Sequence, residues 1–138
     1  MVLITCIDEK NGMLFNNRRQ SRDKILNNHI LSKVNDNKLW ITSFSQDLFD
    51  IVEAKNIIID NDFVDKIGKN DYCFIEDVIP SSVIDNVDKM IIYNWNRHYP
   101  ADQYFDISLE GWTLTSEYEF TGTSHEKMTE KIYIRRNG

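Results

Sequence analysis

The sequence predicts an α/β protein: a three-layer sandwich with a mostly parallel central sheet, helices on both faces and an antiparallel C-terminal hairpin. Three observations support this prediction. Short apolar runs rich in β-branched residues recur along the chain, apolar residues at helical spacing follow the first run, and the last quarter alternates apolar and polar residues in two segments. Strands that alternate with helices form parallel sheets. With 138 residues, the chain is expected to fold as a single domain, 1–138.

The strands are predicted from local composition. Five apolar runs are expected to form the parallel part of the sheet: residues 2–7, 38–42, 56–59, 71–75 and 90–93. Two alternating segments, 112–120 and 127–135, surround a polar tip at 121–126, which is the pattern of a hairpin.

The main helix is predicted over residues 22–32, with Ser21 as its N-cap. Four apolar residues share one face of this helix at helical spacing: Ile25, Leu26, Ile30 and Val34. Residues 13–20, between the first strand and this helix, are interpreted as a loop.

Two shorter helices are expected further along the chain. The first has Ser45 as a candidate cap and contains Leu48, Phe49 and Ile51. The second begins near Pro80, a residue that suits the first turn of a helix.

Composition narrows the function classes. A net charge of −6 argues against a general affinity for nucleic acids or anionic membranes, so neither is expected as a partner. The start of the chain lacks the basic lead and cleavage site of a signal peptide, and a cytoplasmic protein is expected. Cys6 and Cys73 lie in apolar runs and are interpreted as buried thiols, with a redox pair as the alternative.

No metal or cofactor is expected from the local motifs. His29, His98 and His125 have no Cys or His partner at metal-binding spacing. Residues 60–62 are acidic, but they lack the glycine and the terminal glutamate of a calcium loop. The segment 124–126 is interpreted as a hairpin tip.

The order of the elements resembles dihydrofolate reductase over almost the whole chain. The opening strand of that family is matched by residues 3–8, and its Gly-Asp-x-x-Phe-Pro unit is matched by residues 101–106, which read Ala-Asp-Gln-Tyr-Phe-Asp. Trp112 then follows, as a tryptophan does in the family. The resemblance implies a dihydrofolate reductase-like fold, with an NADPH site and a folate site.

The positions that match the NADPH site depart from the family. Glu76 and Asp77 replace glycines that let backbone N–H groups approach the pyrophosphate. Two like charges 4 Å apart cost roughly 4 kcal/mol at an effective dielectric constant of 20. Ser43 replaces an arginine, Ser45 matches a threonine, and Asp60 replaces a serine near the 2′-phosphate. We therefore predict that the chain does not bind NADPH in the manner of the family.

Compared with the family, a strand and a helix on the adenosine side are expected to be deleted, because the segment between Asn61 and Asp71 is short. On the folate side, Ala54 replaces the arginine that holds the glutamate tail. Asp23 matches the acid of the family and is the candidate catalytic residue, although an acid in the first turn also stabilises a helix. The expected ligand cleft is formed by Ile4, Cys6, Met13, Ile25 and Tyr93.

Two hypotheses follow. The first is a non-catalytic binding or regulatory protein on a dihydrofolate reductase-like scaffold, whose partner is a small molecule or a protein, with a homodimer as one option. The alternative is a divergent oxidoreductase that acts on a pterin-like or other heterocyclic substrate through Asp23.

Overall fold

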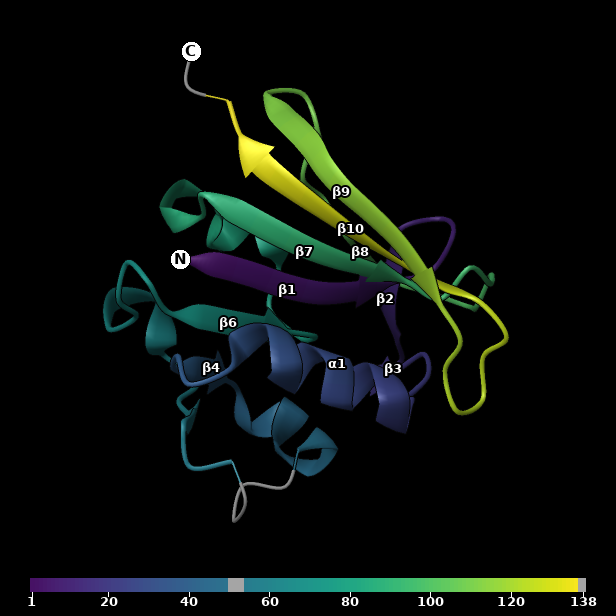
Figure 1. Ribbon diagram of the computed structural model, residues 1–138, viewed down its shortest axis with the longest axis horizontal. Helices are drawn as coiled ribbons and strands as arrows, with labels where there is room; N and C mark the ends of the chain where they lie inside the picture. Colours follow the sequence, from purple (N-terminus) through teal and green to yellow (C-terminus); the bar gives the residue numbers. More distant parts are fainter. Residues whose placement is uncertain (50–53, 137–138) are drawn as a thin grey trace.

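A seven-stranded sheet forms the centre of the computed structural model, which describes residues 1–49 and 54–136. The strand order is β5-β4-β6-β1-β7-β10-β9 (Figure 1). The first five strands in this order are parallel, while β10 is antiparallel to both β7 and β9. This arrangement confirms the predicted fold class. The strands are β1 (Val2–Ile7), β4 (Leu39–Ile41), β5 (Ile57–Ile59), β6 (Tyr72–Ile75), β7 (Lys89–Asn94), β9 (Trp112–Phe120) and β10 (Met128–Arg135).

Different layers cover the two faces of the sheet. On one face, α1 (Lys24–Val34) buries Leu26, Ile30 and Val34 against the strands. The other face is covered by single 3₁₀ turns, by a small second sheet and by the segment that leads to β9. The sequence predicts helices on both faces, but the helical structure of this second layer is limited to 3₁₀ turns among the described residues.

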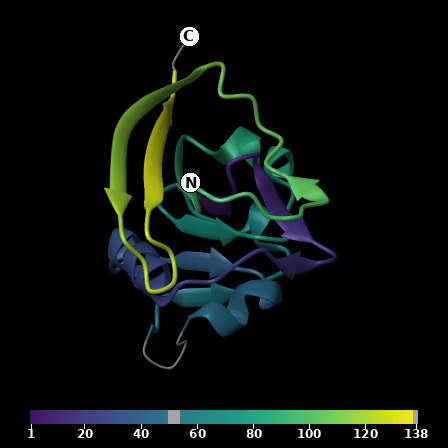
Figure 2. The ribbon, with the colours of Figure 1, turned by 90° about the vertical axis from the view of Figure 1, so that its right-hand side faces the viewer.

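The small second sheet corrects the prediction of a loop over residues 13–20. It contains β2 (Gly12–Phe15), β3 (Arg18–Arg19) and β8 (Gln103–Tyr104), in the order β3-β2-β8. Asn16 and Asn17 have φ angles of 51° and 60°, and they form the two-residue turn between β2 and β3. Figure 2 shows these short strands on the side of the molecule away from the β9–β10 hairpin.

The predicted helix boundaries need three corrections. The N-cap of α1 is Asp23, because its carboxylate accepts from the first free N–H groups, and Ser21 lies outside the helix. The second helix is the 3₁₀ helix η1 (Ser43–Leu48), which contains Ser45 and is preceded by Thr42; Ile51 lies outside the described residues. The third consists of two separate turns, η3 (Pro80–Ser82) and η4 (Ile84–Asn86).

The segment between β5 and β6 forms one 3₁₀ turn, η2 (Phe63–Asp65), and no strand among its residues. Thus β5 is an edge strand. The two cysteines are free and project to opposite faces of the sheet, since Cys73 is the register partner of Leu3 and Cys6 is three residues further along β1. Burial raises the pKa of Cys73 to about 12. Among the described residues, no helix is long and apolar enough to cross a membrane.

Candidate functional site

The candidate site lies at the C-terminal ends of the parallel strands, where ligands bind in open α/β sheets. The chain brings several predicted site residues to this edge because each follows, or ends, a strand. Ser43 and Ser45 follow β4, Asp60 follows β5, Glu76 and Asp77 follow β6, and Tyr93 is near the end of β7.

Arg19 occupies the middle of the predicted cofactor region. Its guanidinium donates from Nε to Glu76 Oε2 at 2.9 Å and from Nη2 to Oε1 at 3.0 Å. The same group donates to both oxygens of Asp47, at 3.0 and 3.1 Å, and to the carbonyl of Phe44. The Arg19 and Glu76 side chains are only 18% and 10% exposed. Arg19 therefore neutralises the carboxylate that was expected to repel phosphate.

This ion-pair network affects the acidity of its members. Burial lowers the pKa of Arg19, but the hydrogen bonds with Glu76 and Asp47 outweigh burial and raise it above its usual value. The same contact with Arg19 lowers the pKa of Asp47. The buried Ser45 hydroxyl also donates to Glu76, at 2.7 Å. Each group in the network is therefore hydrogen-bonded to at least one other member.

The other predicted cofactor-site residues are also bonded within the protein. Asp77 accepts a hydrogen bond from the hydroxyl of Thr42 at 2.8 Å. Asn61 Oδ1 accepts from the backbone N–H and the hydroxyl of Ser43 at 2.9 and 3.2 Å. Asp60 pairs with Lys66 at 2.8 Å on the surface. The structure thus brings Ser45 and Glu76 together and places Asp77, Ser43 and Asp60 in separate pairs.

Asp23 is buried, with 2% of its surface exposed, and both of its oxygens have donors. Oδ1 accepts from three backbone N–H groups at 3.0–3.3 Å, and Oδ2 accepts from a further N–H and from the His125 ring, at 3.0 and 2.9 Å. The four N–H donors are Ile25, Leu26, Thr123 and Ser124. A Cβ atom on Gly122 would lie 2.4 Å from Oδ2, so glycine is required for this close approach. The carboxylate fastens α1 to the tip of the hairpin.

The surroundings of Asp23 keep it ionised. Burial alone raises the pKa of its carboxyl group, but the hydrogen bonds from Ser124, His125, Thr123 and Leu26 outweigh burial and hold the pKa well below its usual range. Because an ionised carboxylate only accepts, His125 Nδ1 must donate the proton of this hydrogen bond.

His125 extends this network into the interior. Its Nε2 lies 3.0 Å from the Ser21 hydroxyl and 3.3 Å from the Tyr99 hydroxyl. The ring is 3% exposed and stacks on Trp95 at 4.7 Å. The order Asp23–His125–Ser21 matches the order of hydrogen bonds in serine hydrolases. Here Nε2 is shared by the hydroxyl groups of two half-buried residues, which favours an internal cross-link over a nucleophile.

A third network surrounds Glu130 on β10, which is 2% exposed. Its carboxylate accepts from the Tyr93 hydroxyl at 2.9 Å and contacts His29 Nε2 at 2.7 Å and Lys33 Nζ at 3.2 Å. Burial, and then the charge of Glu130, raise the pKa of Tyr93 above its usual value. This network fastens the middle of α1 to the sheet.

The three networks lie at the C-terminal edge of the parallel sheet. Comparison with solved structures identifies the fold to which this sheet belongs. The chain is similar to the structure of dihydrofolate reductase from Enterococcus faecalis complexed with NADP(H) and RAB-propyl, with a TM-score of 0.68 and 11% sequence identity. The match covers 99% of this chain and 97% of that one. The fold is that of dihydrofolate reductase. No protein-family model matches the chain, and a search of the curated proteins found no match.

On this dihydrofolate reductase-like fold, the five residues predicted to form a ligand cleft lie in different places. Ile4 and Tyr93 are fully buried beneath α1, and Ile25 is 43% exposed on the outside of the helix. Met13 packs in the core of the opposite face. Cys6 is half-buried, and its pKa is raised by burial and by the nearby Glu76.

Five pockets at the surface of the described residues have linings without Ile4, Cys6, Asp23, Ile25 or Tyr93. The pocket nearest to the networks has a volume of about 520 Å³ and lies beside the β2–β3 turn. It is lined by Phe15, Asn16, Arg18, Arg19, Gln20, Tyr99 and Pro100.

Sequence reasoning missed most of the partners in these networks: Arg19, Asp47, His29, His125 and Glu130. One signal was available for Arg19. The pair Asn16-Asn17 favours a two-residue hairpin turn, which places Arg18 and Arg19 on a strand beside the C-terminal edge of the parallel sheet.

Proposed function

We propose that this chain is a non-catalytic binding or regulatory protein on a dihydrofolate reductase-like scaffold, with the NADPH and folate-tail sites of that fold lost. The observation that carries the proposal is the paired Arg19–Glu76 contact at 2.9 and 3.0 Å. A dinucleotide phosphate at this edge would have to displace Glu76 from Arg19, leave a half-buried carboxylate unpaired and lie beside its charge.

The state of Asp23 supports the same proposal. An acid that holds a heterocycle needs oxygens that can accept from the ligand, and both Asp23 oxygens already accept from the protein. The alternative, a divergent oxidoreductase that uses Asp23, would require the hairpin tip at Thr123 and Ser124 to move away.

The 520 Å³ pocket beside the β2–β3 turn is the surface at this edge that we propose for a binding partner. Its lining combines the exposed aromatic ring of Phe15 with the exposed guanidinium of Arg18. These groups suit either a small molecule or an acidic segment of a protein partner.

Thermal unfolding in the presence of ligands tests the proposal. A ligand at 100 times its dissociation constant stabilises the folded state by about 2.7 kcal/mol, which raises the melting temperature measurably. We expect no change with NADPH, NADH or dihydrofolate, and no loss of NADPH absorbance when NADPH and dihydrofolate are mixed with the protein.

The control for this test is the Asp23→Asn variant, checked for folding by circular dichroism. A melting temperature that rises with NADPH in the parent chain, and not in Asp23→Asn, would contradict the proposal and support the oxidoreductase. An NADPH-dependent rise in both proteins would show that the phosphate edge is open while Asp23 is unused.

A further inference from the structure

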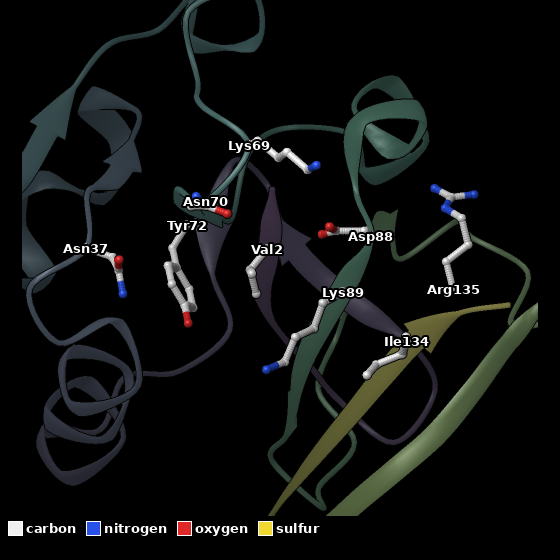
Figure 3. A pocket seen from close by; sticks show the side chains of 9 residues that line it. All are labelled: Val2, Asn37, Lys69, Asn70, Tyr72, Asp88, Lys89, Ile134 and Arg135. Carbon is white, nitrogen blue, oxygen red and sulfur yellow. The ribbon is translucent and has the colours of Figure 1, made fainter. Parts of the chain in front are cut away.

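A pocket of about 610 Å³ lies at the N-terminal ends of the parallel strands, at the opposite edge of the sheet from the three networks. Its floor is one row of side chains across four neighbouring strands. Tyr72 on β6 is the register partner of Val2 on β1, Val2 of Lys89 on β7, and Lys89 of Ile134 on β10. Register partners project to the same face, so the four side chains stand side by side across about 14 Å of sheet. Figure 3 shows Tyr72 and Lys89 on either side of Val2.

The row is only partly covered, because α1 ends before it reaches this edge. The helix packs on this same face, but its last buried residue is Val34, and the chain then turns back to β4 through exposed residues 35–38. Asn37 of this turn forms one wall of the pocket, and Lys69 and Asn70 form another wall just before β6. The size falls within the range of small-molecule sites, about 300–1,000 Å³.

The charges around the row are mainly positive, in a chain whose net charge is −6. Lys69 and Lys89 form no ion pair with any residue in 1–49 and 54–136. The one acid in the lining, Asp88, lies 3.6 Å from the N-terminal ammonium group of Met1. Arg135 donates to the carbonyl of Val87 at 2.7 and 2.9 Å and keeps its positive charge.

We propose that this pocket binds a small organic anion that has a phosphate or carboxylate head and an aromatic body. On binding, the flexible side chains of Lys69 and Lys89, which point apart in Figure 3, turn their ammonium groups toward the head, because neither forms an ion pair among the described residues. The body packs on Val2 and Ile134 and against the ring of Tyr72. The proposal does not depend on the closure of the opposite edge, because no residue of the three networks lines this pocket.

Titration calorimetry with phenyl phosphate, benzoate and inorganic phosphate, at low ionic strength, tests the proposal. We expect phenyl phosphate or benzoate to bind more tightly than inorganic phosphate, because only the aromatic probes cover the apolar floor. The stronger of the two aromatic probes identifies the preferred head group. Amide NMR shifts should change at Val2, Tyr72 and Lys89 and stay constant over residues 15–20.

Two charge-neutralising variants sharpen the test. Lys69→Gln and Lys89→Gln should each weaken binding of the preferred aromatic probe by about tenfold, the effect of one charge-assisted hydrogen bond. Lys24→Gln is the matched control, because it removes the same charge from an exposed residue at the other end of α1. The affinity of this variant for the preferred aromatic probe should equal that of the parent chain.

Three results would overturn the proposal. The first is the absence of binding by all three probes, and the second is equal affinity for inorganic phosphate and the aromatic probes. The third is equal weakening by Lys24→Gln and Lys89→Gln, which would indicate a nonspecific charge effect. None of these results bears on NADPH binding, so the proposed function stands or fails on its own test.

Discussion

The C-terminal and N-terminal edges of the parallel sheet differ in how their charged groups are satisfied. At the C-terminal edge, Asp23, Glu76 and Glu130 all accept hydrogen bonds or ion pairs from within the chain. At the N-terminal edge, Lys69 and Lys89 face a pocket without an ion pair among the described residues. Removing one member of a buried pair leaves its partner uncompensated, whereas removing an unpaired surface charge has little effect on folding. Charge at the first edge therefore contributes to stability, and charge at the second edge is available to a ligand.

The largest expected effect that tests this comparison is that of Asp23→Ala. We expect the free energy of unfolding to fall by about 4 kcal/mol, because the helix cap is lost and buried N–H groups are left without an acceptor. Urea unfolding measures this change. Asp36→Ala is the control: Asp36 is an exposed acid just after α1, and its loss should change stability by less than about 0.5 kcal/mol. Equal effects of the two substitutions would remove the distinction between the edges.

Acid should reproduce part of the Asp23→Ala effect. The folded-state pKa of Asp23 is lowered, and so is that of Asp8, which follows β1 and accepts from the backbone N–H groups of Gly12, Tyr99 and Lys10. The unfolded chain therefore binds more protons as the pH falls. The stability that these groups contribute is complete above their unfolded pKa values and decreases below about pH 4. We expect Asp23→Asn to show a smaller loss of stability between pH 5 and pH 3 than the parent chain, measured by urea unfolding at each pH. Glu9→Gln, at an exposed carboxyl group, should show the same loss as the parent.

The smallest effects come from neutralising one cation at each edge. Arg19→Gln should lower the free energy of unfolding by about 2 kcal/mol, because Glu76 and Asp47 lose their common partner. Lys89→Gln should change it by less than about 0.5 kcal/mol. Thermal unfolding of both variants gives the comparison directly. A larger loss for Lys89→Gln would mean that this lysine supports the fold.

Much of the fold could be predicted because its signals are local. The run 90–93 is apolar on every residue, and it forms β7, where both faces of the strand are buried. The two segments predicted as a hairpin pair as β9 and β10, and Trp112 begins β9 as expected, but β9 is exposed along most of its length and its burial does not alternate. Boundaries were less certain where two residues have similar propensities. Both Ser21 and Asp23 are good N-caps, and the tertiary contacts of Asp23 with the hairpin tip decide between them.

The candidate site could be predicted only in part because its contacts are distant in sequence. Glu76 and Asp77 indicated a changed phosphate region, but the partner of Glu76 is Arg19, 57 positions earlier. His125 meets Asp23 over 102 positions. No periodicity or short motif encodes such a pair, and a single sequence shows no co-variation. The carboxylates were therefore visible in the sequence, while the groups that neutralise them were not.

The central position of β1 has a consequence for synthesis of the chain. Among the strands of this sheet β1 is made first, and both of its neighbours, β6 and β7, are made some 70 residues or more later. The hydrogen bonds of Asp23 with the hairpin tip cannot form until residues 123–125 have also been made. Loop closure over such distances delays the native contacts, so the growing polypeptide carries an apolar segment without its sheet partners until β6 and β7 have been made. Chaperones that shield nascent apolar segments are therefore expected to engage β1 early and to release it only after β6 and β7 have been made.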